Sequence, residues 1–188
     1  KLDGDLILVN PTSFTQQALV FVSGDSFQRF TLNDQPVPTQ QTDSGLWLDA
    51  GELAPYSVVA SSSTSQVSSS TSLETWNLKP DTSHPILEND FLRVEFNTDG
   101  DITRIFDKKA NREILPPNAI ANQFQAFEDR PKSWDAWDVD ISYDDKMWLA
   151  EPAESIKFIE YGELRHTIEI KRKIQSSECI QRISLSLN

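Results

Sequence analysis

Residues 91–106 read Phe91-Leu92-Arg93-Val94-Glu95-Phe96, then Asn97-Thr98-Asp99-Gly100-Asp101, then Ile102-Thr103-Arg104-Ile105-Phe106. The first six side chains alternate between apolar and charged, which is typical of a half-buried β-strand. The Asp-Gly pair predicts a hairpin turn, and the last five residues predict the returning strand. The segment therefore predicts an antiparallel hairpin, with Phe91, Val94 and Phe96 in its core.

Strand patterns continue from this hairpin towards the C-terminus, at residues 156–161, 164–174 and 181–187. In the middle segment one face would carry Leu164, His166, Ile168, Ile170 and Arg172. We nevertheless interpret Lys171-Arg172-Lys173 as a solvated strand end. Because the last strand pattern reaches Asn188, we expect the β unit at 80–188 to be the first part of a larger one.

The first 60 residues also consist of short apolar runs separated by turn residues. Leu6–Val9 and Ala18–Val22 are two such runs, and Asp49-Ala50-Gly51 separates Leu46-Trp47-Leu48 from the strand pattern at 56–60. This spacing predicts a small antiparallel β-sandwich at 1–60. Residues 61–72 are almost all serine and threonine, so we assign 61–79 to a linker. The predicted fold class is all-β.

The composition excludes several classes of partner. The net charge is −12, from 29 acidic and 17 basic residues, which repels nucleic-acid phosphates and anionic lipids. No apolar run approaches the about 18 residues of a membrane-spanning helix. The single cysteine, Cys179, cannot form an internal disulfide, and this favours a reducing compartment, the cytoplasm. Neutral ligands such as carbohydrates remain compatible with the charge.

The segment from Phe127 to Asp140 contains two tryptophans, five carboxylates and two cations. Indole faces can stack on the C–H faces of sugars, and carboxylates accept hydrogen bonds from hydroxyl groups. The segment therefore predicts a sugar-binding loop with six candidate residues: Glu128, Asp129, Trp134, Asp135, Trp137 and Asp138. In the alternative interpretation, the tryptophans fill the edge of a core and the carboxylates are merely solvated.

Other chemistries are weaker fits to these residues. Asp135 with Asp138, or Glu128 with Asp135, would need the about 5 Å separation of a retaining glycosidase pair, which spacing within a loop cannot establish. Calcium could use Asp135, Asp138, Asp140, Asp144 and Asp145, but the glycine and final glutamate of an EF-hand loop are missing. His84 and His166 are isolated and more consistent with structural roles. We assign no catalytic residue and no metal ligand.

The order of these signals resembles the C-terminal β region of family 38 glycoside hydrolases, the class II α-mannosidases, most closely the cytosolic and vacuolar type. Four segments carry the resemblance: Leu87–Phe96, Asp99–Lys108, Asn111-Arg112-Glu113 and Glu128–Asp140. The family has a comparable Phe-Glu-Asp…Pro-x-x-Trp-Asp-Ala-Trp-Asp segment, and here Arg130 precedes Pro131. Leu8–Phe14 is similar to the small β domain that precedes this region. The resemblance covers most of the chain apart from the serine tract.

The resemblance implies a small β-sandwich followed by the first part of a large one, of the supersandwich, galactose-mutarotase-like type. It implies retaining hydrolysis of α-mannosidic bonds, with the nucleophile, the acid and a zinc ion in an N-terminal catalytic domain. None of those residues transfers to this sequence, so we expect no cofactor here and no activity for this chain alone. The implied partners are that catalytic domain and a mannose-containing oligosaccharide, and any oligomer would form through the longer protein. A stand-alone carbohydrate-binding module is the alternative.

Overall fold

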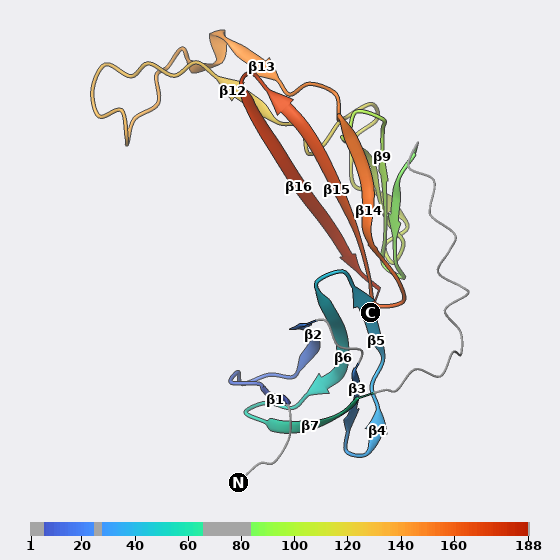
Figure 1. Cartoon of the computed structure of the whole chain (residues 1–188). Coiled ribbons are helices and arrows are strands. Elements are labelled where there is room, and N and C mark those ends of the chain that lie inside the picture. The colour runs from blue at the N-terminus through green and yellow to red at the C-terminus, as the bar shows by residue number, and fades with distance from the viewer. Residues whose placement is uncertain (1–5, 25–27, 66–83, 188) are drawn as a thin grey trace. The chain divides into compact units, whose positions relative to one another are not determined.

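A computed structural model of the chain describes residues 6–24, 28–65 and 84–187 (Figure 1). The chain divides into two compact units: Lys1–Leu78 with Gly162–Arg165, and Lys79–Tyr161 with His166–Asn188. Ten strand pairs of the described residues are antiparallel, which confirms the predicted all-β class. The one helical element among the described residues is a 3-10 turn, η1 (Tyr143–Asp145). No helix in the described ranges has the length and hydropathy needed to cross a bilayer.

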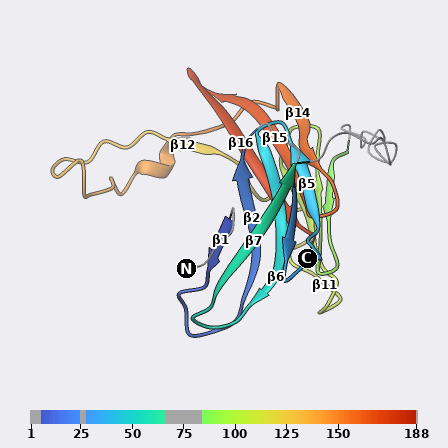
Figure 2. The same ribbon diagram turned by 60° about the horizontal axis from the view of Figure 1, so that its bottom comes forward.

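The first unit is a small β-sandwich, as predicted (Figure 2). One sheet has the order β1-β7-β3-β4, formed by Leu6–Val9, Val58–Ser65, Gln28–Leu32 and Gln35–Pro36. The other has the order β2-β6-β5, formed by Gln16–Ser23, Gly45–Leu53 and Thr39–Thr42. Alternating side chains from both sheets make its core of Leu8, Phe30, Leu46, Leu48, Ala50 and Leu53.

Two strands of this unit run further than the sequence predicted. Strand β6 continues through Asp49-Ala50-Gly51 as a bulge, in which Gly51 has a φ of 67° and donates its N–H to the Asp49 carboxylate at 2.9 Å. Strand β7 continues to Ser65, so residues 61–65 are strand and not linker. The ladder with β3 satisfies this serine backbone, and the buried Ser61 hydroxyl donates to the Thr31 carbonyl at 3.0 Å. The rest of the predicted linker lies outside the described residues.

Asn10 holds together the turn that follows β1. Its buried side-chain amide donates to the carbonyl oxygens of Phe14, Leu53 and Ala54 at 2.9–3.0 Å. Its side-chain oxygen accepts from the N–H and the hydroxyl of Thr12, at 3.0 and 2.7 Å. Because a buried amide is stable only when its donors and acceptors are paired, these contacts explain the local sequence Asn-Pro-Thr-Ser-Phe.

The second unit has two facing sheets and a separate hairpin. One sheet has the order β11-β10-β9-β8, formed by Arg112–Glu113, Ile102–Asp107, Leu92–Phe96 and Ile86–Glu88. The other has the order β14-β15-β16, formed by Ser155–Tyr161, Arg165–Ile174 and Ser177–Ser186. Strands β12 (Gln125–Phe127) and β13 (Met147–Leu149) form the hairpin. Leu87, Phe96, Ile168 and Ile170 are buried between the sheets.

The hairpin predicted at 91–106 is confirmed as β9 and β10, with Phe96 buried and Val94 packed against the same core. Phe91 was wrongly placed in the core, since it is 50% exposed. It lies before β9, in a turn where the Asn89 side-chain oxygen accepts the N–H groups of Phe91 and Leu92 at 2.9 and 2.7 Å. Phe91 is therefore outside the strand, and the alternation expected of strand side chains begins only at Leu92.

Arg172 is buried, with only 2% of its surface exposed, so its prediction as part of a solvated strand end is wrong. Its guanidinium donates to the Asp101 carboxylate at 2.7 Å and to the Gly100 carbonyl at 2.5 Å. Gly100 leaves room for this contact, because a Cβ there would lie 2.6 Å from the Arg172 Nη2 atom and its φ is 83°. The ion pair thus joins β15 to the β9–β10 turn, and so links the two sheets.

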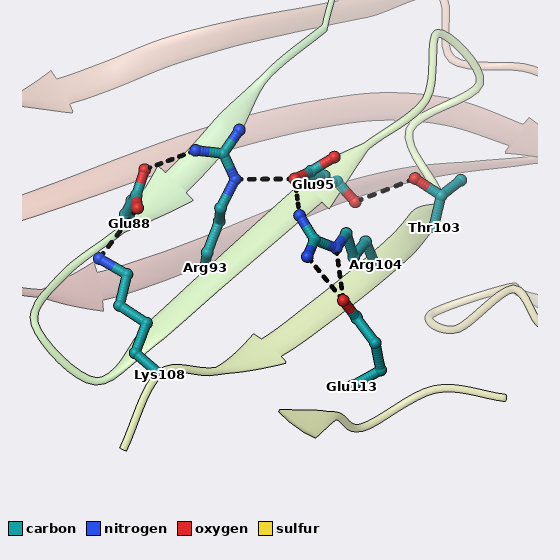
Figure 3. Close-up of polar contacts among 7 residues, drawn as sticks. All are labelled: Glu88, Arg93, Glu95, Thr103, Arg104, Lys108 and Glu113. Atoms are coloured by element: carbon teal, nitrogen blue, oxygen red, sulfur yellow. Dashed lines mark hydrogen bonds and ion pairs between the residues drawn. The ribbon is translucent and has the colours of Figure 1, made fainter. Parts of the chain in front are cut away.

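Opposite the core, ion pairs cover the β8–β11 sheet. Figure 3 shows these residues in a continuous row: Lys108, Glu88, Arg93, Glu95, Arg104 and Glu113. The N–O distances between neighbours in the row are 2.6–3.0 Å. The hydrogen bond from Lys108 lowers the pKa of Glu88, and that from Arg93 lowers the pKa of Glu95. The β14–β16 sheet carries three comparable pairs: Arg182–Glu169, Lys171–Glu178 and Lys173–Glu154. Ion pairs therefore neutralise much of the charge on the two outer faces of the unit.

We predict that Asp101→Ala lowers the free energy of unfolding of the second unit by about 3–5 kcal/mol, because it leaves the Arg172 charge buried without its carboxylate. Urea denaturation followed by circular dichroism measures the change. Arg182→Ala, which removes an exposed ion pair, should cost about 1 kcal/mol or less. Equal losses in the two variants would contradict the central role of the buried pair.

We also predict that the stability of the second unit decreases in acid through Glu88 and Glu95. Their folded-state pKa values lie below the unfolded value of about 4.3, so their contribution is complete above that pH. It is lost as the pH falls through the folded pKa. Urea midpoints between pH 7 and pH 3 should change less in Glu95→Gln than in the unaltered chain. Glu151→Gln, outside the row, should keep the full pH dependence.

Candidate functional site

The predicted sugar-binding residues lie in one loop, residues 128–146, which connects β12 to β13. The two strands pair in the register Gln125 with Leu149 and Phe127 with Met147. The Glu128 N–H donates to the Lys146 carbonyl at 3.1 Å and extends the hairpin by one pair. Figure 1 shows the loop reaching away from the sheets of its own unit. The sequence therefore placed all six candidates on one projecting element, which we call the tryptophan loop.

Glu128 and Asp129 lie at the base of the tryptophan loop and are engaged within it. The Glu128 carboxylate accepts a hydrogen bond from the Lys146 ammonium at 2.6 Å and pairs with the Arg130 guanidinium. The Lys146 hydrogen bond, assisted by the charge of Arg130, lowers the pKa of Glu128. The Asp129 carboxylate accepts the Asp140 N–H at 2.8 Å, across the loop. Both carboxylates thus hold the two arms of the loop together.

Trp134 and Trp137 lie at the opposite end of the loop, on a tight turn. The Trp134 carbonyl accepts the N–H groups of Trp137 and Asp138 at 2.7 and 2.9 Å, and Trp134 has a φ of 61°. Bulky residues rarely adopt this left-handed conformation, which concentrates at functional positions. The two side chains are 77% and 90% exposed. The alternative in which they fill the edge of a core is therefore wrong.

The carboxylates beside the tryptophans are less engaged than those at the base. Within the described ranges, the Asp135 carboxylate has no hydrogen-bond or ion-pair partner. In the same ranges, the Asp138 carboxylate accepts one hydrogen bond, from the N–H of the adjacent Val139 at 3.1 Å. Both groups therefore keep acceptor capacity for an external ligand, as sugar hydroxyls would require.

Sequence reasoning missed the apolar side chains that accompany the two indoles. Ile141 is 95% exposed, and further exposed side chains lie along the loop and hairpin: Phe127, Val139, Tyr143, Met147, Trp148 and Leu149. Phe127 and Tyr143 pack edge to face at 5.3 Å. The alternation of apolar and polar residues from Val139 to Tyr143 was an available signal. Exposed apolar side chains gathered in this way are typical of an interaction surface.

The described residues do not fit a metal ion. No group of three or more His, Cys, Asp or Glu side chains in the described ranges comes together to hold one, so the calcium alternative gains no support. The resemblance implies a zinc ion in the N-terminal catalytic domain and not in this chain, so this result does not test it. The His166 ring stacks on Tyr161 at 4.2 Å with an interplanar angle of 14°, which is a packing contact. We derive no catalytic step through zinc in this chain.

Comparison with known proteins gives a consistent family relationship. The family model described as the C-terminal domain of glycosyl hydrolases family 38 matches residues 87–188, more than half of the chain. Alpha-mannosidase G of Dictyostelium discoideum is 30% identical over 87 residues, which are 45% of this chain and 8% of that protein. Human alpha-mannosidase 2C1 is 40% identical over 53 residues, which are 28% of this chain and 5% of that protein.

A solved structure shares the fold. The crystal structure of an alpha-mannosidase from Enterococcus faecalis V583 superposes with a TM-score of 0.52 at 15% identity, covering 88% of this chain and 23% of that one. The chain thus spans only a small part of the length of each of these relatives.

Proposed function

Because its residues 87–188 match the C-terminal domain model, the chain belongs to glycosyl hydrolase family 38, and we propose that it acts as the C-terminal β region of a longer retaining α-mannosidase. The substrate would be a mannose-containing oligosaccharide, and the partner of this region would be the catalytic domain of the same polypeptide. The chain supplies packing for that domain and a loop beside the sugar. The similarity to alpha-mannosidases over 53–87 residues supports the substrate class.

One observation carries the proposal beyond family membership: Trp134 and Trp137 are exposed on an ordered turn, next to carboxylates with free acceptor capacity. An indole face can cover the C–H face of a mannose ring, while Asp135 and Asp138 accept hydrogen bonds from its hydroxyl groups. We therefore propose that these four residues contact the sugar or the rim of the pocket that holds it.

The bond-breaking chemistry belongs, in this proposal, to the catalytic domain. Retention requires a nucleophile and an acid about 5 Å apart, and we assign both to the catalytic domain. Zinc would be bound there as well. The Trp-Asp-Ala-Trp-Asp block at 134–138 supports assignment to the cytosolic and vacuolar type, and the single cysteine supports a cytoplasmic location.

We predict that Trp134→Ala or Trp137→Ala lowers kcat/KM for an α-mannoside by about 3- to 10-fold in an α-mannosidase that contains this chain. This is the size of one lost ring contact. Steady-state kinetics with an aryl mannoside and a mannobiose measure it. Phe14→Ala, which truncates an exposed ring in the other unit, should leave kcat/KM unchanged. Unaltered kinetics in both tryptophan variants would exclude a sugar-site role for the loop.

A stand-alone carbohydrate-binding module remains the second candidate, since exposed indoles also characterise such modules. Titration calorimetry of the 188-residue chain with mannose or mannobiose distinguishes the two. We expect no measurable heat, because in the proposed function the sugar is held mainly by the catalytic domain. Saturable binding by the chain alone, abolished by Trp137→Ala, would favour the module instead.

A further inference from the structure

We infer that Glu128 is the positioning residue of the tryptophan loop: its carboxylate joins the two arms and keeps Asp135 and Asp138 free to meet the ligand. The ligand itself rests on the proposed function. The inference assigns different tasks to residues that the sequence grouped together. Glu128 and Asp129 order the loop, and Trp134, Asp135, Trp137 and Asp138 present the contact surface.

The position of Glu128 suits this task. It directly follows β12, and its N–H and carboxylate both contact Lys146, which directly precedes β13. The same carboxylate contacts Arg130 on the outgoing arm. Its side chain is less exposed than that of either cation, so water competes less with these contacts. One side chain therefore closes the loop where it leaves the hairpin.

The ion pairs of Glu128 also affect how the remaining charges of the loop can pair. Residues 128–146 contain seven carboxylates and only three cations: Arg130, Lys132 and Lys146. Glu128 engages two of these three. A flexible Arg130 or Lys146 released from Glu128 would be attracted to the nearest unpaired carboxylates, and Asp135 lacks a partner among the described residues. Glu128 therefore limits ion pairing that would occupy the sugar-facing acceptors.

The turn at Trp134 explains why the tryptophan loop must be held in place where it joins the hairpin. A tryptophan with a positive φ is unfavourable in isolation and persists only when its surroundings constrain it. In the described structure the constraints on the loop include the Glu128 pairs, the Asp129–Asp140 bond, the turn bonds to the Trp134 carbonyl and the ring contact of Phe127 with Tyr143. A binding surface held in one conformation before the ligand arrives loses less entropy on binding.

The first test uses the 188-residue chain and does not involve sugar. Limited trypsin digestion with mass spectrometry measures cleavage after Lys132 in the loop, with cleavage after Lys157 in β14 as the internal reference. We expect Glu128→Gln to accelerate cleavage after Lys132 at least fivefold, with cleavage after Lys157 unchanged. Asp144→Asn is the matched control, since it removes the same charge from the same loop but leaves the contacts of Glu128 with Lys146 and Arg130 intact. Equal cleavage in the two variants overturns the inference.

The exchanged pair Glu128→Lys with Lys146→Glu provides the rescue. It reverses the bridge to position 146 but also places a like charge beside Arg130. The exchange is therefore made together with Arg130→Gln, and protection of Lys132 should return to within twofold of the Arg130→Gln variant. Persistent rapid cleavage in the exchanged pair overturns the claim that the bridge orders the loop. This result is independent of whether the loop contacts sugar.

The second test measures the consequence for the ligand in the longer α-mannosidase. We expect Glu128→Gln to raise KM for a mannobiose about three- to tenfold and to leave kcat within twofold, and Asp144→Asn to change neither. A fall in kcat without a change in KM overturns the positioning role. The tryptophan variants could leave hydrolysis unaltered while Glu128→Gln still accelerates trypsin cleavage after Lys132. In that case the proposed function fails, and the ordering of the loop by Glu128 stands.

Discussion

The architecture of the larger unit depends on one buried charge pair, Arg172 with Asp101. The pair joins the two amphipathic sheets across their apolar core, together with the hydrogen bond from the Asn89 side-chain amide to the Ser186 carbonyl at 2.9 Å. The guanidinium reaches from β15 to the β9–β10 turn and uses the absence of a side chain at Gly100. Desolvating such a pair is costly, so its value lies more in fixing one arrangement of the sheets than in added stability.

Much of the fold follows from local patterns in the sequence. Alternation predicted β9 and β10, and the Asp-Gly pair predicted their turn, because both signals act between neighbouring residues. The same alternation placed Arg172 on the face of Ile168 and Ile170, but its burial was not predicted, since its partner is 71 residues distant and a charge in a basic triplet normally faces water. The strand at Ser61–Ser65 was missed for a similar reason: its backbone is satisfied by β1 and β3, not by its own apolar side chains.

The candidate site shows the same division between local and distant information. Composition alone located the tryptophan loop and its acids, since aromatic and acidic density is visible in a single window. It could not separate the carboxylates that order the loop from those that face outward, because Glu128 and Lys146 are 18 residues apart. The exposed apolar residues around Ile141 were also missed, because alternation from Val139 to Tyr143 does not by itself show that the apolar side chains face solvent.

The rows of ion pairs on the two outer faces of the larger unit bear on specificity. A protein surface that approached either face would gain few new ion pairs and would have to disrupt existing ones. These faces therefore disfavour binding by other proteins. A binding partner of this unit avoids the cost of breaking the ion pairs by docking elsewhere on its surface.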